Sequence, residues 1–437
     1  MKKIVKNLPS GWVEKSLKEN TLFLRRGKSP EYCDNNQGLV VVNQECIRWD
    51  SINMSNVKFH VVPNKIEEDF FLRCGDILIN STGTGTIGRV NEWLYPNVSA
   101  IADSHVTVFR VNKETIDAKY ARYFLTSELG QRYLESLCYT GSTNQIELSK
   151  RYLLKLRLPC APLPEQKAIS GILSKVDKAI EVVEKSIKAA EHFKKSLTQN
   201  LLTGKLKPDG TWRNEDEFYL DEKFGNIPKG WEVARVKDFG IVYTGKTPPT
   251  VESHVFSESL SENRYPFVTP ADFFREKYID VSERYVTEKG LSYSYRLPVN
   301  SICIVCIGST IGKIGIAKVE ICTNQQINSL IPNRNNSGEF FYYMMSYRVL
   351  HFKEIAAVNA TPQINKSNFN KYQILRPLDK SEQKKIANWL SVWDDEIFIK
   401  NNKVQSLKTL KKSLMQNLLT GKVRVDVEKV NKLLEEV

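Results

Sequence analysis

The sequence predicts a mixed α/β protein in which two globular domains alternate with two long helices. Three observations support this fold class. Nearly the whole chain consists of two similar copies of one module. Each copy ends with a long amphipathic helical pattern. The rest of each copy contains both strand-like and helix-like runs. The clearest repeated phrase is QNLLTGK, at residues 199–205 and again at 416–422. Glu165 and Glu382 recur at the same spacing. The repeat is therefore a duplicated module and not a solenoid repeat of roughly 20–50 residues.

The long helices are indicated by apolar residues at alternating steps of three and four after Glu165 and Glu382. Gly204 and Gly421 follow these patterns at the position of a C-cap glycine. A helix of about 38 residues is roughly 57 Å long, and its apolar stripe needs a partner. We expect the two helices to pair antiparallel in a coiled-coil-like spacer, which gives the duplicated chain a pseudo-two-fold arrangement. In this pairing, Leu173, Val176 and Ile180 should face Leu414, Leu410 and Leu407. Two independent helices, each packed on its own domain, are the alternative.

The globular parts contain strand-like runs such as DILIN and HVTVFRV in the first copy, and SICIVCIG and INSLIP in the second. Helix-like runs are AKYARYFLTSELGQRYLESL and GEFFYYMMSYRVLHFKEIAA. The predicted organisation is a first domain at 1–158, a helix at 159–204, a linker at 205–226, a second domain at 227–378, a helix at 379–422 and a tail at 423–437.

Composition narrows the class of protein. A chain of 437 residues is long enough for two or three domains with cores of their own. The net charge of +13 favours a polyanionic partner, most often nucleic acid. No apolar run reaches the ~18 residues of a membrane helix, the N-terminus lacks the apolar segment of a signal peptide, and the eight cysteines are scattered. We therefore expect a cytoplasmic protein.

Motifs for catalysis or cofactor binding are incomplete. Residues 83–88 fit Gly-x-Gly-x-x-Gly, but no helix follows, as a dinucleotide site requires. Residues 308–315 resemble a P-loop with too short a spacing and no Ser or Thr after the lysine. Cys303 and Cys306 lie on opposite faces of a predicted strand, without a second cysteine pair for zinc. We predict no catalytic or metal site.

The two glycine-containing loops are more informative as equivalents of each other. Both follow an apolar strand, and both contain Thr-Ile-Gly before a basic residue, Arg89 in one and Lys313 in the other. Such loops are typical of tight turns, and they also bring donors close to a ligand. Ser, Thr, Lys, Arg, Asn and Gln side chains contact phosphates and base edges. The predicted DNA-binding residues are Ser81, Thr82, Thr84, Thr86, Arg89, Ser142, Thr143, Asn144 and Gln145 in the first domain, and Lys246, Thr247, Ser309, Thr310, Lys313, Asn324, Gln325, Thr361 and Gln363 in the second.

With the segments PLPEQKAISGIL and KKSLTQNLLTGKL and their copies, the chain resembles the specificity subunit of type I restriction–modification enzymes. LPSGWVEKSL, IPKGWEVARV, GSTIGKIGIA and TPQINKSNFN are similar to the framework of that family's target recognition domains. The resemblance runs from about Leu8 to Val423. In the first domain, ADSHVTVFR diverges from its counterpart NQQINSLIP.

The resemblance implies a non-catalytic subunit in which each target recognition domain reads one half of a split site in double-stranded DNA. It implies two modification subunits as partners, which bind S-adenosylmethionine and methylate adenine. It also implies restriction subunits that use ATP and Mg²⁺. No cofactor is expected on this chain, and no membrane. Two alternatives remain, the specificity subunit of a related type II system that cuts on both sides of a split site, and a coiled-coil scaffold that binds proteins.

Overall fold

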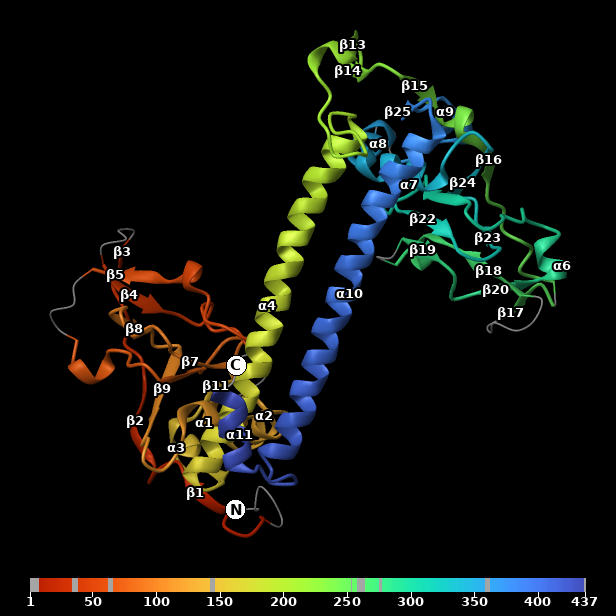
Figure 1. Cartoon of the computed structure of the whole chain (residues 1–437). Helices are drawn as coiled ribbons and strands as arrows, with labels where there is room; N and C mark the ends of the chain where they lie inside the picture. Colours follow the sequence, from red (N-terminus) through yellow and green to blue (C-terminus); the bar gives the residue numbers. More distant parts are fainter. Residues whose placement is uncertain are drawn as a thin grey trace. The chain divides into compact units, whose positions relative to one another are not determined.

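The computed structural model describes residues 8–33, 38–61, 66–141, 146–252, 254–257, 264–274, 277–357 and 362–435. The chain divides into two compact units (Figure 1). Unit 1 consists of residues 1–185 and 400–437, and unit 2 consists of residues 186–399. Each unit is described by itself below.

Both predicted long helices are confirmed. α4 spans Leu163–Leu202 and α10 spans Lys380–Leu418. The division into units cuts both helices, so each unit holds the N-terminal part of one helix and the C-terminal part of the other. A third helix in the tail, α11 (Val427–Glu435), was not predicted.

Within each unit the two helix segments pair antiparallel, as ion pairs and ring contacts show. In unit 1, Lys408 pairs with Glu184 at 2.8 Å and Lys411 with Asp177 at 2.6 Å, so the α10 numbers rise as the α4 numbers fall. In unit 2, the rings of Phe193 and Trp393 lie in a tilted contact with centroids 4.7 Å apart, and Arg213, beyond the end of α4, donates to Glu382 at the start of α10 at 2.6 Å. The alternative of two independent helices is therefore wrong.

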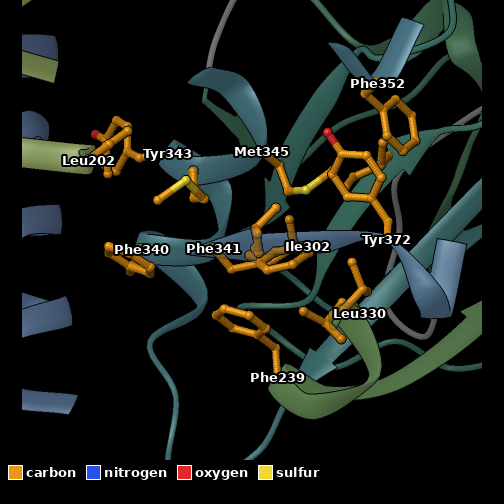
Figure 2. Close-up of a cluster of buried hydrophobic side chains, with 14 of the residues drawn as sticks. Leu202, Phe239, Ile302, Leu330, Phe340, Phe341, Tyr343, Met345, Phe352 and Tyr372 are labelled. Atoms are coloured by element: carbon orange, nitrogen blue, oxygen red, sulfur yellow. The ribbon is translucent and has the colours of Figure 1, made fainter. Parts of the chain in front are cut away.

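Each unit builds its core from both long helices. In unit 2, Leu202 of α4 belongs to the same buried cluster as Phe341 and Ile302 of the domain (Figure 2). Leu390 of α10 belongs to this cluster as well. In unit 1, Leu173 of α4 and Leu418 of α10 are buried in one cluster with the domain. A long helix that enters the cores of two units gains packing at both of its ends, which an isolated amphipathic helix lacks.

The repeated phrase ends each long helix against the start of a globular domain. Its two leucines are buried, with Leu202 and Leu419 each 1% exposed. Gly204 has a φ of +70°, and a Cβ there would lie 2.3 Å from the Cγ of Pro228. Gly421 has a φ of +71° and would place a Cβ 2.5 Å from the Cγ of Pro9. The helix that follows the first domain thus closes on the second domain, and the helix that follows the second closes on the first.

The Glu-Gln pair at the start of each long helix fastens the helix to its own domain. Gln166 is fully buried; its side-chain oxygen accepts from the backbone N–H of Asp117, the N-cap of α1 (Ala118–Thr126), at 3.0 Å. Gln383 accepts in the same way from Ser337, the N-cap of α7 (Gly338–Tyr347), at 2.9 Å. The predicted equivalence of the two copies therefore extends to single hydrogen bonds.

The glutamate of each Glu-Gln pair binds an arginine that follows the repeated phrase of the other copy. Glu165 accepts two 2.8 Å hydrogen bonds from Arg424, which follows Gly421. Glu382 accepts one of 2.6 Å from Arg213, which follows Gly204. Because Glu165 is buried, the paired guanidinium satisfies a carboxylate that would otherwise be costly to bury.

A Tyr–Asp–Lys triad links the helix pair to the domain in both units. In unit 1, Asp177 accepts from Lys411 at 2.6 Å and from the hydroxyl of Tyr123 at 2.7 Å. In unit 2, Asp394 accepts from Lys194 and from the hydroxyl of Tyr343. Burial raises the pKa of the Asp177 carboxyl, but Lys411 and the two hydrogen bonds outweigh it, so the pKa lies below its ordinary value.

The triad explains one error in the predicted helical seam. We expected Leu410 to be buried against Val176, but Leu410 is 47% exposed. Its neighbour Lys411 is the residue that reaches α4. Adjacent residues in a helix point about 100° apart, so Leu410 faces away from the seam.

The strands of unit 1 form two four-stranded sheets with the orders β2-β9-β6-β7 and β3-β5-β4-β8, and two pairs, β1-β12 and β10-β11. Their bounds are β1 Val13–Ser16, β2 Thr21–Arg26, β3 Tyr32–Cys33, β4 Leu39–Val42, β5 Lys58–His60, β6 Ile77–Asn80, β7 Val90–Glu92, β8 Ala100–Ala102, β9 Val106–Val111, β10 Tyr139–Thr140, β11 Glu147–Leu148 and β12 Arg157–Cys160.

Unit 2 has the sheets β16-β24-β21-β22-β19 and β17-β20-β18-β23 and the pairs β15-β25 and β13-β14. Their bounds are β13 Phe218–Asp221, β14 Gly225–Pro228, β15 Trp231–Arg235, β16 Gly240–Thr244, β17 Phe256–Ser257, β18 Arg264–Val268, β19 Tyr278–Ile279, β20 Tyr285–Thr287, β21 Ile302–Val305, β22 Ile314–Ala317, β23 Cys322–Thr323, β24 Ile327–Pro332 and β25 Gln373–Pro377. The two sheets and the pair β15-β25 follow the order seen in unit 1, with β19 as an additional strand, whereas β13-β14 is not the counterpart of β10-β11.

Short helices complete the two domains. They are α2 (Glu128–Tyr133), a π-helical turn (Leu134–Cys138) and α3 (Lys150–Leu153) in unit 1, and α5 (Val236–Phe239), α6 (Glu288–Leu291), α8 (Val349–Ala356) and α9 (Lys366–Lys371) in unit 2, with 3₁₀ turns at Met54–Asn56, Glu68–Phe70, Glu215–Glu217 and Pro270–Asp272. Among the described helices, none combines the length and the apolar character needed to cross a membrane.

Candidate nucleic-acid interface

In each unit, a loop containing glycine follows an inner strand of a sheet, β6 in the order β2-β9-β6-β7 and β21 in the order β16-β24-β21-β22-β19. This glycine loop comprises residues 81–89 between β6 and β7 in unit 1, and residues 306–313 between β21 and β22 in unit 2. The backbone N–H of Asn80 donates to Arg89 at 2.9 Å, and that of Val305 donates to Lys313 at 2.9 Å. Gly83 has a φ of +99° and Gly308 a φ of +96°, a left-handed conformation that favours glycine. The predicted equivalence of the loops is confirmed.

A second segment, found again in both units, lies beside the glycine loop. The N–H of Leu148 donates to the carbonyl of Ser81 at 2.8 Å, and the N–H of Ile364 donates to Cys306 at 2.8 Å. The N–H of Gly308 also donates to Pro362 at 3.0 Å. This arrangement brings the predicted Gln363, which is exposed, next to its glycine loop. The predicted residues Ser142, Thr143, Asn144, Gln145 and Thr361 lie outside the described residues.

A third segment, which sequence reasoning found in only one copy, is GKSP at 27–30 and GKTP at 245–248. The N–H of Lys28 donates to Ala102 at 3.1 Å, and the N–H of Lys246 donates to Thr323 at 2.9 Å. A Cβ on Gly27 would lie 2.0 Å from the carbonyl oxygen of Ala102, so only glycine allows this approach. We predicted Lys246 and Thr247 but missed Lys28 and Ser29. The four-letter match between the copies was the signal that could have found them.

The side chains of the unit 1 loop differ in how free they are. Thr84 is exposed, whereas Thr86 donates to carbonyls inside the loop. The Thr82 hydroxyl lies 2.8 Å from Nδ1 of His105, a residue that was not predicted. Arg89 donates to the carbonyl of Gly85 at 3.2 Å. Its Nε is buried and has no hydrogen-bond partner in the described part of the chain.

In unit 2, most of the predicted side chains are polar groups at the surface of the domain. The Thr247 hydroxyl donates to Gln325 at 2.6 Å, which ties the second-copy GKTP segment to the chain after β23. Lys313 donates to the carbonyl of Pro270 at 3.1 Å. Lys246 and Ser309 are exposed, and Thr310 is half-buried. These groups can donate to phosphates and to base edges.

Two of the residues predicted to contact DNA are buried in the domain. Ser81 is 0% exposed, and its hydroxyl is 2.5 Å from that of Thr107 on the neighbouring strand β9. Asn324 is 9% exposed and donates to Gln326 at 2.9 Å. Both side chains bond to the framework of the domain, which leaves them little or no surface for DNA.

The corresponding loops carry different chemistry in the two units. Asp103 of unit 1 accepts from the hydroxyl of Tyr32 at 3.2 Å and from the N–H of His105 at 2.6 Å. Burial, together with the Asp103 carboxylate, raises the pKa of Tyr32 to about 12, so this phenol stays a donor at neutral pH. In unit 2 the same turn presents Gln325 and Gln326. Two scaffolds of one design therefore present unlike surfaces.

Comparison with known proteins places the chain in a family. The family model described as type I restriction modification DNA specificity domain matches residues 9–192 and 228–409. The putative type I restriction enzyme MjaX specificity subunit of Methanocaldococcus jannaschii is 26% identical over 427 residues, which cover 96% of this chain and 95% of that protein. The MjaIX specificity subunit of the same organism is 31% identical over 211 residues, covering 47% of each chain.

A solved structure agrees in fold. The crystal structure of the type I restriction–modification S subunit from M. genitalium superimposes with a TM-score of 0.61 at 16% identity, covering 95% of this chain and 98% of that one. The duplicated family match, the repeated domain and the paired helices lead to one conclusion. The chain belongs to the type I restriction–modification specificity family and is a non-catalytic DNA-recognition subunit.

Proposed function

We propose that unit 1 and unit 2 each read one half of a bipartite DNA site, and that the paired helices set the gap between the halves. One observation carries this proposal: the same three segments meet in both units, but with different side chains at equivalent positions. A duplicated scaffold preserves the geometry of contact, while the exchange of the exposed His105 for the amide side chain of Gln326 changes which base edges can be bound.

The lysines at the equivalent GKSP and GKTP segments support a division between residues that contact the phosphate backbone and residues that read bases. Lys28 and Lys246 are held by the same backbone hydrogen bond and carry the charge that phosphates attract. Gln325, Gln363 and Arg89 are of the residue types that read adenine and guanine in the major groove. The net charge of +13 supports a DNA partner as well.

The partners we propose are two modification subunits, which bind S-adenosylmethionine and methylate adenine, and restriction subunits that use ATP and Mg²⁺. The chain itself is proposed to hold no cofactor and to act in the cytoplasm. Among the described residues, no group of three or more His, Cys, Asp and Glu side chains is placed to bind a metal ion.

The test is to express the chain with its cognate modification subunits and to sequence the methylated adenines. The expected result is a split motif with a fixed gap, and no methylation when either component is absent. Methylation in one short contiguous motif would contradict the proposal. Double-strand breaks on both sides of the site would instead support the related type II system.

A further inference from the structure

Unit 1 contains a groove of about 750 Å³ between the α1–α2 corner of the domain and the C-terminal part of α10. Its floor includes Phe124 and Leu419, which are buried. Its rim carries basic side chains, the lysines on α10 and after it, and Arg132 on α2. We call it the lysine groove and define it by Arg132, Lys408, Lys412 and Lys422.

The charged side chains of this part of α10 and of the chain just after it are all positive. Between Ile397 and Val425 the chain contains no Asp or Glu, whereas it contains Lys400, Lys403, Lys408, Lys411, Lys412, Lys422 and Arg424. In the equivalent part of the first copy, on α4, glutamates at 181, 184 and 191 lie among the lysines. The duplication therefore does not account for the excess of positive charge, which belongs to one copy alone.

Neighbouring carboxylates neutralise only part of this charge. Lys411 is engaged by Asp177, and Lys408 pairs with Glu184 at 2.8 Å. Glu128 is shared, at 2.6 Å from Arg132 and 3.6 Å from Lys412. Within the described chain, Lys422 has no carboxylate within ion-pair distance. The groove thus keeps a net positive charge at its mouth.

The lysine groove adjoins the glycine loop of unit 1. On α2, whose residues 128 and 132 line the groove, the side chain of Gln131 donates to the carbonyl of Gly88 at 2.9 Å. From the other side, Asn80 at the base of the glycine loop donates to Gln44 at 2.9 Å. The chain then runs from Gln44 to Trp49, which lines the groove. Two separate routes therefore connect the candidate base-reading loop to the basic rim.

We propose that the lysine groove binds the phosphate backbone of duplex DNA next to the half-site read by unit 1. This inference rests on the proposed function. Lysine, threonine and glutamine side chains on the rim contact phosphates without reading sequence. Such contacts suit DNA in the gap, whose bases need not be recognised, and they fix the duplex in position.

The test measures nonspecific DNA binding by the full chain, using a random-sequence duplex and a series of KCl concentrations. The variant is Lys408→Gln, Lys412→Gln and Lys422→Gln together. Each lost phosphate contact lowers the slope of log affinity against log salt by about 0.9, so we expect a fall of about 2–3. A matched control, Lys18→Gln, Lys119→Gln and Lys155→Gln, removes equal charge from exposed lysines of unit 1 outside the groove. The control should leave the slope nearly unchanged.

Equal loss of slope in the two variants would overturn the proposal, because net charge alone would then explain the effect. It would also be overturned if the groove variant bound DNA normally but failed to assemble with the modification subunits, since the groove would then receive an acidic protein segment. If the triple variant does not fold, Lys422→Gln alone should lower the slope by about one, and no change would refute the groove. Failure of the proposed function is seen separately, as the absence of site-specific methylation by the wild-type complex.

Discussion

Replacement of Asp177 by Asn should weaken the attachment of the helix pair to the unit 1 domain. The Asp177 carboxylate accepts from Lys411 at 2.6 Å, from Tyr123 at 2.7 Å and from Arg122 at 3.3 Å. The Asp177 and Lys411 side chains are 32% and 21% exposed. This exposure is intermediate between that of surface ion pairs and that of buried ones. A surface ion pair stabilises a protein by about 0–1 kcal/mol, and breaking a buried ion pair costs about 3–5 kcal/mol. We expect a loss of about 1.5–3 kcal/mol for Asp177→Asn and a coupling of about 1–2 kcal/mol with Lys411→Gln.

The effect should depend on pH in a defined direction. The pKa of Asp177 is lower in the folded chain than the ~3.9 of an unfolded aspartate. The stability that it contributes is therefore present above about pH 4 and is lost as the pH falls through the folded pKa. The difference in the free energy of unfolding between wild type and Asp177→Asn should be constant from about pH 5 to 7 and should shrink at lower pH.

Hydrogen exchange resolves the two units, which a single melting curve does not. Asp177→Asn should speed exchange in the residues of unit 1, by about tenfold for each 1.4 kcal/mol lost. Asp394→Asn, the equivalent change, should act on unit 2. A double-mutant coupling below about 0.3 kcal/mol between Asp177 and Lys411 would refute the assignment of the triad as a structural link.

Four further substitutions separate the roles of other residues. Gly421→Ala forces a φ of +71° on alanine and sets its Cβ 2.5 Å from Pro9, so unit 1 should lose about 1–2 kcal/mol, and an unchanged melt would show that the contact with Pro9 is dispensable. Leu201→Ala should cost about 2–5 kcal/mol because Leu201 is 1% exposed, whereas Leu410→Ala should change stability by less than about 0.5 kcal/mol; similar thermal shifts would contradict the observed burial. Lys28→Gln should lower the salt slope of DNA binding by about one without shifting the thermal unfolding, and an unaltered slope would remove Lys28 from the interface.

Much of the fold could be predicted because long-range repetition and local pattern agree. Continuous apolar runs such as DILIN and INSLIP became the buried strands β6 and β24. The repeated phrase marked both helix ends, since Gly204 and Gly421 occupy the left-handed position that closes each helix. The predicted antiparallel pairing already brings each helix end to the domain of the other copy. What the repeat could not reveal is which residues meet there, because sequence identity does not say which surfaces meet.

The errors arise where tertiary contacts override local pattern. Leu410 fits the helical period, but the seam at that level is polar, and Lys411 uses its long side chain to reach Asp177. Ser81 looks like an exposed loop residue, yet the pairing of β6 with β9 places its hydroxyl against Thr107. Lys28 was missed because GKSP and GKTP are too short to stand out until the strands bring them to the glycine loops.

Exchange of one recognition domain tests the account most directly. Residues 8–158 would be replaced by the corresponding domain of a relative, and the adenines methylated by the resulting complex would be mapped by sequencing. The helix segments and the second domain stay unchanged, so we predict that one half of the split motif changes while the other half and the gap remain. If both half-sites changed together, or if the original motif persisted, the two units would not read DNA independently and the central claim would be contradicted.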